Sequence, residues 1–391
     1  MKENSDVIVI GGGINGVSTA FYLAQQGARV TLIEKRFIAS GPTGYSSAII
    51  RQHYSNPVTA RMALESLRVW KNFNEVIGGN CGFTQCGFIM AVQPPDVEGL
   101  KANIRLQQSV GIQTSFVSPQ EIKEIDPHAD VAGIGGAAYE PEGGYCDAAT
   151  AANAFAQAAQ RLGTRMEIGV EATRIQVESG RVVGVETSQG FYPAPHVVVV
   201  AGPWTPRLLS HLGVEFPSIA ARIKIGFYRR PAQFDRHCVW GDFANQIYLR
   251  PETGNLTLVG SISPDEANDT VADPDNFRET VELEVLADFA ERAVKRFPAL
   301  EQSHVLRSYA ALYDVTPDWH PILDGLPGVE GLYVCAGSSG HGFKLAPAAG
   351  KMMAKLIMDG KKQDDDIELF SFERFEKGNL VRGQYAYSIV G

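Results

Sequence analysis

The chain has 391 residues, of which 45% are hydrophobic, and its formal net charge at pH 7 is −9. The length suits about two domains, and this apolar content excludes wholesale disorder. The acidic balance, without any block of Lys or Arg, argues against a nucleic-acid-binding surface. No apolar run reaches the about 18 residues of a membrane-spanning helix, so we expect no membrane span.

The N-terminus and the cysteines both bear on location. Residues 1–5 lead directly into an apolar strand, so we expect no signal peptide. An odd number of scattered cysteines without a C-x-x-C pair fits reduced, mostly buried thiols in a cytoplasmic protein. A catalytic or cofactor-linking thiol is the alternative, but no base or ligand spacing supports it, and no metal site is predicted. The cysteines stand at positions 81, 86, 146, 238 and 335.

The N-terminal segment has the pattern of a strand, a glycine-rich turn and a helix. Residues 6–10 form a continuous β-branched apolar run, as in a buried strand. We expect a helix over residues 17–26 that ends at Gly27, and a second strand over residues 29–33. Between the first strand and the helix stands Gly11-Gly12-Gly13-Ile14-Asn15-Gly16.

Each glycine of this G-x-G-x-x-G motif has a mechanical role. Gly11 permits the tight turn, Gly13 lets a pyrophosphate approach the backbone, and Gly16 lets the helix pack closely against the strand. The helix N-terminus presents free N–H groups and a positive dipole end to the phosphates. Glu34, about 20 residues further on, is placed to accept hydrogen bonds from an adenosine ribose. Because Glu34 favours a free 2′-hydroxyl, the pattern predicts FAD or NAD rather than NADP, and disfavours a glycine turn without a ligand.

Two further stretches read as parts of the same nucleotide-binding domain. One contains an alanine-rich helix and several strands, the last of them a fully buried valine run. The other contains a strand, a glycine-rich turn and a helix. The expected elements are helices over residues 148–162 and 346–358, and strands over residues 170–177, 181–187, 197–200 and 331–336.

The intervening stretches have a different pattern. Loops and a helix over 97–110 are expected in the first; strands over 246–250 and 256–260 and a long helix over 277–297 are expected in the second. The predicted fold is α/β, with a Rossmann-like domain and an inserted, mainly antiparallel sheet domain that binds substrate. The active site should lie at their junction. The predicted boundaries are 1–85, 147–215 and 314–391 for the nucleotide-binding domain, and 86–146 and 216–313 for the substrate-binding domain.

Motifs along nearly the whole chain carry a resemblance to a known family. Beyond the glycine motif and Glu34 they are GPTGYSS (41–47), IIRQHY (49–54), VVAGPW (199–204), LYDVTPD (312–318) and GSSGHGFK (337–344). On these motifs the chain is identified as a member of the D-amino acid oxidase superfamily of flavoproteins, and it is most similar to the sarcosine oxidase and glycine oxidase branch. The resemblance implies FAD as cofactor, in a domain of the glutathione-reductase type.

The resemblance also implies a substrate site. In sarcosine oxidases the counterparts of His341 and Lys344 line the substrate pocket, and the lysine holds the substrate carboxylate. Arg51 matches a second basic residue that approaches the flavin or the carboxylate. Tyr248 and Arg250 lie on a strand resembling one that supplies pocket residues in glycine oxidase. The structural alternatives are a surface lysine, a buried histidine with satisfied partners, and a strand pair that only packs.

The implied cofactor contacts extend beyond the glycine motif. Ser46 and Ser47 could donate hydroxyls to the pyrophosphate or ribityl chain, or could be an ordinary loop pair. The glycines around His341 would let backbone N–H groups approach the flavin pyrimidine and stabilise its negative charge. The expected cofactor-binding residues are Gly11, Gly13, Ile14, Asn15, Gly16, Glu34, Lys35, Gly44, Ser46, Ser47, Val170, Gly202, Trp204, Gly337, Gly340, Gly342, Phe343 and Lys344.

The chain departs from the family pattern at three places. Ala311 stands where monomeric sarcosine oxidase attaches its flavin through cysteine, so the FAD is expected to be non-covalent. Ala48 replaces the first arginine of an Arg-Ile-Ile-Arg stretch, and the strand over 256–260 lacks a lysine credited with oxygen activation. The implied electron acceptor is therefore either O₂ or a quinone or partner subunit, and a homo- or hetero-oligomer is compatible with both.

The sequence thus predicts an FAD-dependent enzyme that oxidises a small secondary or N-methylated amino acid. Hydride passes to flavin N5, and the resulting imine hydrolyses. Three alternatives stay open: a 2-hydroxy acid or glycerol-phosphate oxidoreductase of the same fold, a flavin-carrying subunit of a heteromeric dehydrogenase, and a non-catalytic NAD-binding regulator.

Overall fold

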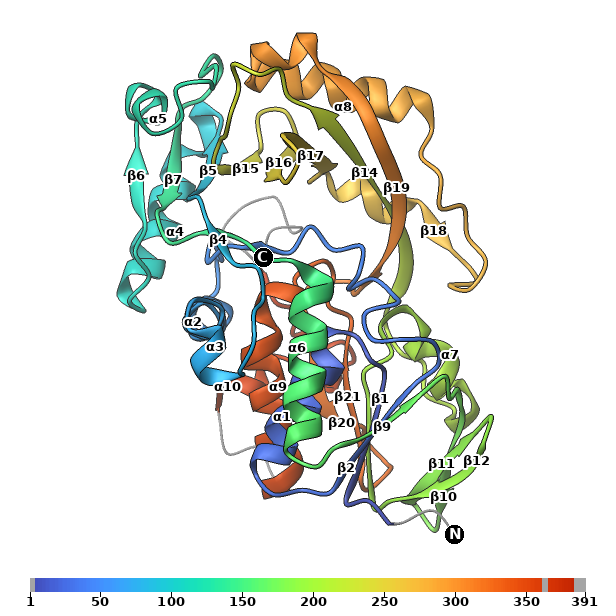
Figure 1. The fold of residues 1–391 in the computed structure, drawn as a ribbon. Coiled ribbons are helices and arrows are strands. Elements are labelled where there is room, and N and C mark those ends of the chain that lie inside the picture. The colour runs from blue at the N-terminus through green and yellow to red at the C-terminus, as the bar shows by residue number, and fades with distance from the viewer. Residues whose placement is uncertain (1–3, 361–364, 383–391) are drawn as a thin grey trace.

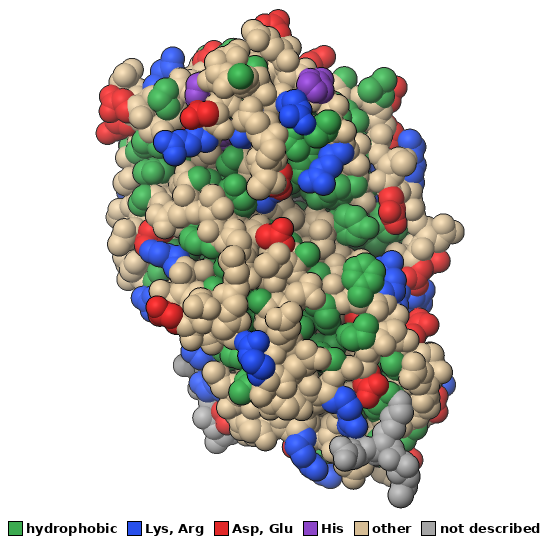
Figure 2. Space-filling model, in the orientation of Figure 1, with side chains coloured by type: hydrophobic (Ala, Val, Ile, Leu, Met, Phe, Trp, Pro, Cys, Tyr) green, Lys and Arg blue, Asp and Glu red, His purple; other side chains and the backbone are tan. Residues whose placement is uncertain are grey.

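A computed structural model describes residues 4–360 and 365–382 of the chain, so the end of the predicted range 314–391 lies outside it. The strands of the described part form two large sheets that lie in opposite halves of the molecule (Figure 1). Lys and Arg side chains are interspersed with Asp and Glu over the face drawn in Figure 2. None of the described helices is long and apolar enough to cross a membrane.

The first large sheet has six strands in the order β20-β21-β13-β1-β2-β9. All neighbouring strands are parallel except the pair of β20 and β21. The strands β1 and β2 are fully buried, as their continuous apolar runs predicted. The strands are β1 (Val7–Ile10), β2 (Val30–Glu34), β9 (Arg165–Ile168), β13 (His196–Val199), β20 (Ile322–Gly325) and β21 (Leu332–Ala336).

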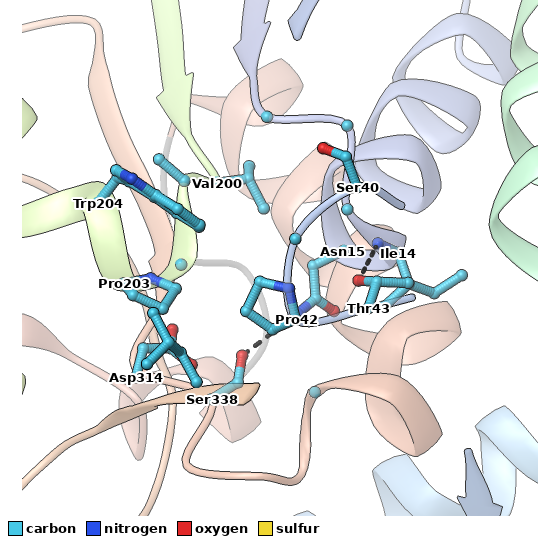
Figure 3. Close-up of a pocket in the computed structure, with 18 of the residues that line it drawn as sticks. Ile14, Asn15, Ser40, Pro42, Thr43, Val200, Pro203, Trp204, Asp314 and Ser338 are labelled. Atoms are coloured by element: carbon cyan, nitrogen blue, oxygen red, sulfur yellow. Dashed lines mark hydrogen bonds between the residues drawn. The ribbon is translucent and has the colours of Figure 1, made fainter. Parts of the chain in front are cut away.

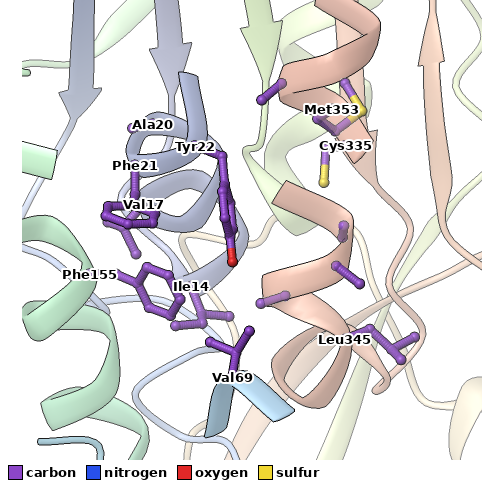
Figure 4. Packing of buried hydrophobic residues seen from close by; sticks show 14 of the residues in the cluster. Ile14, Val17, Ala20, Phe21, Tyr22, Val69, Phe155, Cys335, Leu345 and Met353 are labelled. Carbon is purple, nitrogen blue, oxygen red and sulfur yellow. The ribbon is translucent and has the colours of Figure 1, made fainter. Parts of the chain in front are cut away.

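Helices cover one face of this sheet, and a small antiparallel sheet lies beside the other (Figure 1). The helices α1 and α9 pack so closely that a Cβ at Gly350 would lie 2.4 Å from the Ser18 Oγ, so only glycine fits at this position. Figure 4 shows the apolar side chains that fill the space around α1 and α9. The elements are α1 (Ile14–Gln25), α6 (Ala148–Arg161), α9 (Gly342–Asp359), β10 (Ala172–Glu178), β11 (Arg181–Thr187) and β12 (Gly190–Pro193).

The second large sheet has nine strands, with β19 pairing to β14 beside the path β18-β14-β17-β16-β15-β5-β7-β6. Its pairs are antiparallel except that of β5 with β15. The strands are β5 (Phe88–Val92), β6 (Ser115–Val117), β7 (Gly136–Glu140), β14 (Ile219–Arg229), β15 (Val239–Asp242), β16 (Ile247–Glu252), β17 (Leu256–Ser261), β18 (Thr270–Val271) and β19 (His304–Val315).

Shorter elements complete the described chain. A small sheet pairs the strands in the order β3-β8-β4, and α8 packs beside the nine-stranded sheet (Figure 1). These elements are β3 (Ile49–Ile50), β4 (Thr84–Gln85), β8 (Gly144–Tyr145), α2 (Pro57–Lys71), α3 (Phe73–Val76), α4 (Val97–Ser109), α5 (Pro119–Ile125), α7 (Thr205–Leu209), α8 (Leu283–Arg296) and α10 (Asp365–Glu368).

The predicted α/β fold, with a Rossmann-like part and a mainly antiparallel sheet, is confirmed, whereas some element bounds were wrong. The helix expected over 277–297 begins only at Leu283, because the carbonyls of Arg278 and Thr280 accept hydrogen bonds from the Arg222 guanidinium. The helix expected over 346–358 begins earlier, at Gly342. The stretch 86–146 was expected to hold loops and one helix, but it also supplies β5, β6 and β7. The domain boundaries themselves stay a prediction.

A buried ion pair ties the segment after α10 to the motif at residues 312–318. The Asp318 carboxylate accepts hydrogen bonds from Arg374 Nε at 2.8 Å and Nη2 at 3.0 Å. Their side chains are 1% and 3% exposed. Arg374 also donates to the carbonyl of His320, whose ring lies 6.4 Å from that of His341. The pair therefore supports the backbone beside the glycine-rich turn.

Removing Arg374 should strongly destabilise the protein, because Asp318 would be left as a buried charge without its partner. Arg374→Met is expected to lower the free energy of unfolding by about 3–5 kcal/mol. Lys377→Met, which breaks an exposed pair with Glu373, should have a much smaller effect on stability. Urea denaturation followed by circular dichroism measures both. Equal destabilisation of the two variants would contradict the prediction.

Candidate active site

Two adjoining cavities lie between the two large sheets. The larger has a volume of about 540 Å³ and the smaller about 80 Å³. Ser47, Tyr313 and Gly340 line both, so the cavities share a wall. Figure 3 shows the larger cavity, with Trp204 on one side and the segment containing Pro42 and Thr43 opposite.

The glycine motif forms a turn at one wall of the large cavity. Gly11 has a φ of +119°, and a Cβ there would lie 2.3 Å from the carbonyl oxygen of Val200. A Cβ at Gly16 would lie 2.0 Å from the Gly11 carbonyl oxygen. The turn and the close helix packing therefore require glycine at both positions, as the sequence predicted. They aim the N-terminus of α1 at the cavity, which Gly13 lines.

Side chains around the turn fix its polar groups. The Glu34 carboxylate lines the cavity and accepts hydrogen bonds from the backbone N–H groups of Gly12, at 2.7 Å, and Arg36, at 2.8 Å. Thr43 Oγ1 accepts from the N–H of Ile14 at 3.0 Å (Figure 3). Asn15 donates to Ser338 Oγ at 3.2 Å, while its buried Oδ1 has no partner in the described structure. Thr43 was not predicted as a site residue, although it stands within the motif at residues 41–47.

Most of the predicted cofactor residues meet in the large cavity, and four do not line it. Gly16 and Gly44 instead allow close backbone contacts. A Cβ at Gly16 would lie 2.0 Å from the Gly11 carbonyl oxygen, and a Cβ at Gly44 would lie 2.4 Å from that of Ala39. Gly337 packs on Thr316, and Lys344 lines the small cavity. Those that do line it are Gly11, Gly13, Ile14, Asn15, Glu34, Lys35, Ser46, Ser47, Val170, Gly202, Trp204, Gly340, Gly342 and Phe343.

The loop between β21 and α9 has a strained conformation. Gly337, Ser339 and Gly340 all have positive φ angles, of +69°, +49° and +83°. Asp314, at the end of β19, holds the loop: its carboxylate accepts from the N–H of Gly337 at 2.7 Å, and its carbonyl accepts from the N–H of Ser339 at 2.9 Å. Burial raises the pKa of Asp314 to about 6. Asp314 stands within the motif at residues 312–318, but no role was predicted for it, because its role depends on a contact between distant segments.

The small cavity collects four of the five predicted catalytic residues, Arg51, Tyr248, His341 and Lys344. The fifth, Arg250, lines neither cavity. It is buried, pairs with Glu252 and lies over the ring of Tyr145 at 4.5 Å. Strand alternation predicts that Tyr248 and Arg250 share a face of β16, but side-chain pairing turns the arginine away from the cavity.

Lys344 lies in the first turn of α9, where the helix dipole disfavours a cation. It is buried, and its Nζ donates to the Gly340 carbonyl at 3.2 Å. Burial and then the Arg51 charge lower the pKa of Lys344 well below its ordinary value. An anion in the cavity would reverse this effect, so the arrangement favours binding of a carboxylate.

His341 is buried beside Lys344. Its Nδ1 lies 3.2 Å from the hydroxyl of Tyr54, and its Nε2 has no hydrogen-bond partner in the described structure. Burial, followed by the charges of Lys344 and Arg51, lowers the pKa of His341 well below its ordinary value, so the imidazole is neutral. Tyr54 stands within the motif at residues 49–54, but no role was predicted for it. Its ring also lies under the Arg51 guanidinium, at 4.6 Å.

The residues of the large cavity fit a dinucleotide. A carboxylate at Glu34 stands at one end, the N-terminus of α1 lines the wall, and the strained loop before α9 stands at the other end, next to the small cavity. Asn15 Oδ1 is a buried acceptor without a partner in the described structure, which is typical of a site that holds a polar ligand.

Comparison with known proteins identifies the family. The family described as FAD dependent oxidoreductase (DAO) matches residues 6–356, and the chain belongs to it. The protein is thus an FAD-dependent oxidoreductase, and the expected resemblance is confirmed.

Individual relatives are similar over nearly their whole length. The chain is 26% identical to sarcosine oxidase subunit beta of Rhodobacter capsulatus, covering 100% of this chain and 93% of that protein. It is 29% identical to human peroxisomal sarcosine oxidase, covering 96% and 97%. The crystal structure of L-proline dehydrogenase from P. horikoshii superposes with a TM-score of 0.89 at 30% identity, covering 97% of this chain and 100% of that one.

Gly340→Ala should disturb both cavities, because its Cβ would lie 2.6 Å from the Tyr313 ring, which borders them both. Gly133→Ala is a matched control, since Gly133 has a similar φ of +77° with no neighbouring atom within 4 Å. Both variants should lose about 1–2 kcal/mol of stability from backbone strain. Only Gly340→Ala should also retain less FAD per chain after purification, measured by absorbance. Equal FAD content in the two variants would contradict the prediction that the wall formed by Gly340 and Tyr313 contributes to FAD binding.

Proposed function

We propose that this enzyme oxidises a small secondary or N-methylated amino acid, such as sarcosine, proline or a similar compound, with FAD as the hydride acceptor. One observation carries the proposal. A small cavity containing Arg51, His341 and Lys344 adjoins the dinucleotide-shaped cavity across Ser47, Tyr313 and Gly340. The names of the similar sarcosine oxidases and L-proline dehydrogenase support the same substrate class.

The cavity chemistry suits a small amino acid. Arg51 and Lys344 supply positive charge for a carboxylate, and a bidentate arginine contact would also fix its orientation. The volume of about 80 Å³ leaves room for only a short side chain. The remaining wall is largely apolar and would surround the N-substituent, with Ile49, Phe88, Met90 and Ile262 as its aliphatic and aromatic members.

The side chains divide the work of positioning and proton control. When bound, FAD supplies the hydride acceptor at its N5 atom. Arg51 and Lys344 hold the carboxylate, so that the substrate Cα–H bond is kept in one orientation. Burial, and then the neighbouring Tyr313 and Tyr309, raise the pKa of Tyr248 well above its ordinary value, so its hydroxyl stays protonated and can donate a hydrogen bond. The oxidised substrate leaves as an imine, which water hydrolyses.

The state of His341 favours an amine over a hydroxy acid as substrate. Oxidation of an alcohol by hydride transfer needs a base for the hydroxyl proton, whereas an amine can bind already neutral. His341 is the obvious base, but its lowered pKa makes it a weak one. We therefore place the 2-hydroxy acid and glycerol-phosphate reactions behind amine oxidation.

Two residues that line the large cavity, Ala311 and Cys335, support non-covalent attachment of FAD. Ala311 lines the large cavity and offers no thiol. Cys335 also lines it, but burial raises the pKa of this thiol to about 12, so it remains protonated and unreactive. The cofactor would then be held by non-covalent contacts with the folded chain alone.

The proposed electron acceptor is a quinone or partner subunit, with O₂ as the alternative. In the described lining of the small cavity the one lysine is Lys344, which the carboxylate would occupy. The similarity to a sarcosine oxidase subunit beta is compatible with a flavin-carrying role in a larger complex. The five cysteines are unpaired, which supports a reducing compartment such as the cytoplasm.

Lys344→Met should abolish tight binding of the substrate carboxylate. Titrating the anaerobic protein with sarcosine, L-proline, glycine and L-2-hydroxyglutarate, while following the visible flavin band, tests substrate class directly. An amino acid should bleach the wild-type flavin, and Lys344→Met should lower the efficiency by at least about 30-fold, the lower end for an unpaired buried charge. Lys351→Met, on the exposed side of α9, should leave it unchanged.

Bleaching by the hydroxy acid alone would contradict the proposal. Re-admitting air to the reduced protein then distinguishes the acceptors, because rapid return of the flavin band would favour O₂ over a quinone or partner subunit.

Binding of an unreactive carboxylate should weaken as the pH rises. Lys344 has a lowered pKa in the empty site, and a bound anion raises it, so the complex takes up a proton once the pH exceeds the empty-site value. The dissociation constant of pyrrole-2-carboxylate, measured by flavin difference spectra, should rise up to about tenfold per pH unit until the pKa of the complex is reached. Lys344→Met should flatten this dependence. A flat profile in the wild type would contradict the assigned role of Lys344.

A further inference from the structure

The segment between β18 and α8 reaches from the nine-stranded sheet to the nucleotide-binding half of the molecule (Figure 1). Asp275 in this segment contacts three side chains from distant parts of the chain. Its carboxylate lies 2.5 Å from Lys35 Nζ, 2.5 Å from Arg207 Nη2 and 2.9 Å from Trp204 Nε1. Asp273 adds a second contact with Arg207, at 3.3 Å.

These contacts form one cluster. Lys35 also lies over the ring of Trp204, with its Nζ 4.2 Å from the ring centroid. The backbone N–H of Asp275 donates to the Asp273 carboxylate at 3.0 Å, which fixes the turn of the segment. Burial raises the pKa of Asp275, but the hydrogen bonds from Lys35, Arg207 and Trp204 outweigh it and hold the pKa below its ordinary value. The carboxylate is therefore ionised at neutral pH.

The cluster lies at the boundary of the FAD cavity. Lys35 follows Glu34 at the end of β2, and Trp204 and Arg207 follow the turn after β13. All three line the large cavity together with Asp275, which comes from the other half of the molecule. A bridge between the two halves thus crosses one side of the cavity, near the carboxylate that we assign to the adenosine ribose.

We propose that Asp273, Asp275, Lys35, Trp204 and Arg207 form a clasp that retains FAD, so that opening this clasp limits cofactor release. The inference rests on the proposed non-covalent attachment, which leaves contacts with the folded chain as the means of holding the cofactor. The contacts suit a clasp that opens, because the side chains of Asp275, Lys35 and Arg207 are 39%, 24% and 52% exposed. Partly exposed ion pairs are individually weak and sensitive to salt.

A competing interpretation makes the opposite prediction. Lys35 and Arg207 are cations at the wall of a cavity that receives an anionic pyrophosphate. If Asp275 merely competes with the cofactor for these cations, removing its charge would tighten FAD binding and slow release. The sign of the change therefore distinguishes a clasp from a competitor.

The test is the rate of FAD release from the holoenzyme, followed by the rise in flavin fluorescence after dilution. Asp275→Asn should release FAD about tenfold faster, because it weakens several modest charged interactions at once. Asp288→Asn is the matched control, since it removes a half-exposed carboxylate from an ion pair with Arg292 on α8. It should leave the release rate unchanged. Raising the NaCl concentration should accelerate release in the wild type and much less in Asp275→Asn.

A double-mutant cycle tests the partner. Arg207→Gln should accelerate release in the wild-type background and have a smaller further effect in Asp275→Asn, because the contact with Asp275 is already weakened there and only that with Asp273 remains. Unchanged or slower release in Asp275→Asn, or equal acceleration by Asp288→Asn, would overturn the clasp. Purification of the wild type without FAD, and failure to rebind it, would instead overturn the proposed function.

Discussion

The close approach of three backbone segments at the glycine turn is the constraint on which the rest of the site depends. The Val200 carbonyl lies against Gly11, and the Gly11 carbonyl lies against Gly16, so no side chain fits at either position. This contact sets where α1 begins and where its N-terminus points. It also places the end of β13 beside the end of β1, from which the chain continues to Trp204 and Arg207. This wall of the cofactor cavity is thus built on backbone contacts at the ends of the strands.

The small cavity depends on the charges of its side chains. Arg51, Lys344 and His341 are buried close together. Burial, and then the charge of neighbouring cations, lowers the pKa of the lysine and of the histidine. In the proposed function, a substrate carboxylate supplies the missing negative charge. Binding of the substrate and protonation of Lys344 would then be coupled. A buried lysine charge is unfavourable without a partner, and a ligand carboxylate would supply one. Such a site favours acids over neutral amines.

Features that depend on local pattern could be predicted from the sequence. The turn and the helix α1 follow from residues that are near neighbours in the chain. His341 and Lys344 were expected from the resemblance to sarcosine oxidases, and the structure brings both to the small cavity. Residues whose positions depend on distant partners escaped prediction. Arg250 was expected in the pocket but pairs with Glu252, and residues 277–282 were expected to be helical but bond to Arg222 instead. No role was predicted for Tyr54 or Asp275, because the side chains to which they hydrogen-bond, His341 and Trp204, are distant in the chain.

The two halves of the molecule contribute to the cavities in different ways. Backbone geometry in the six-stranded half fixes the cofactor cavity, and it leaves little room for variation. The nine-stranded half supplies side chains, among them Tyr248 to the small cavity and Asp275 to the boundary of the large one. If FAD were attached covalently, side chains from the nine-stranded half would not be needed to hold it. Under the proposed non-covalent attachment, retention depends on contacts with the folded chain, among them those between the halves.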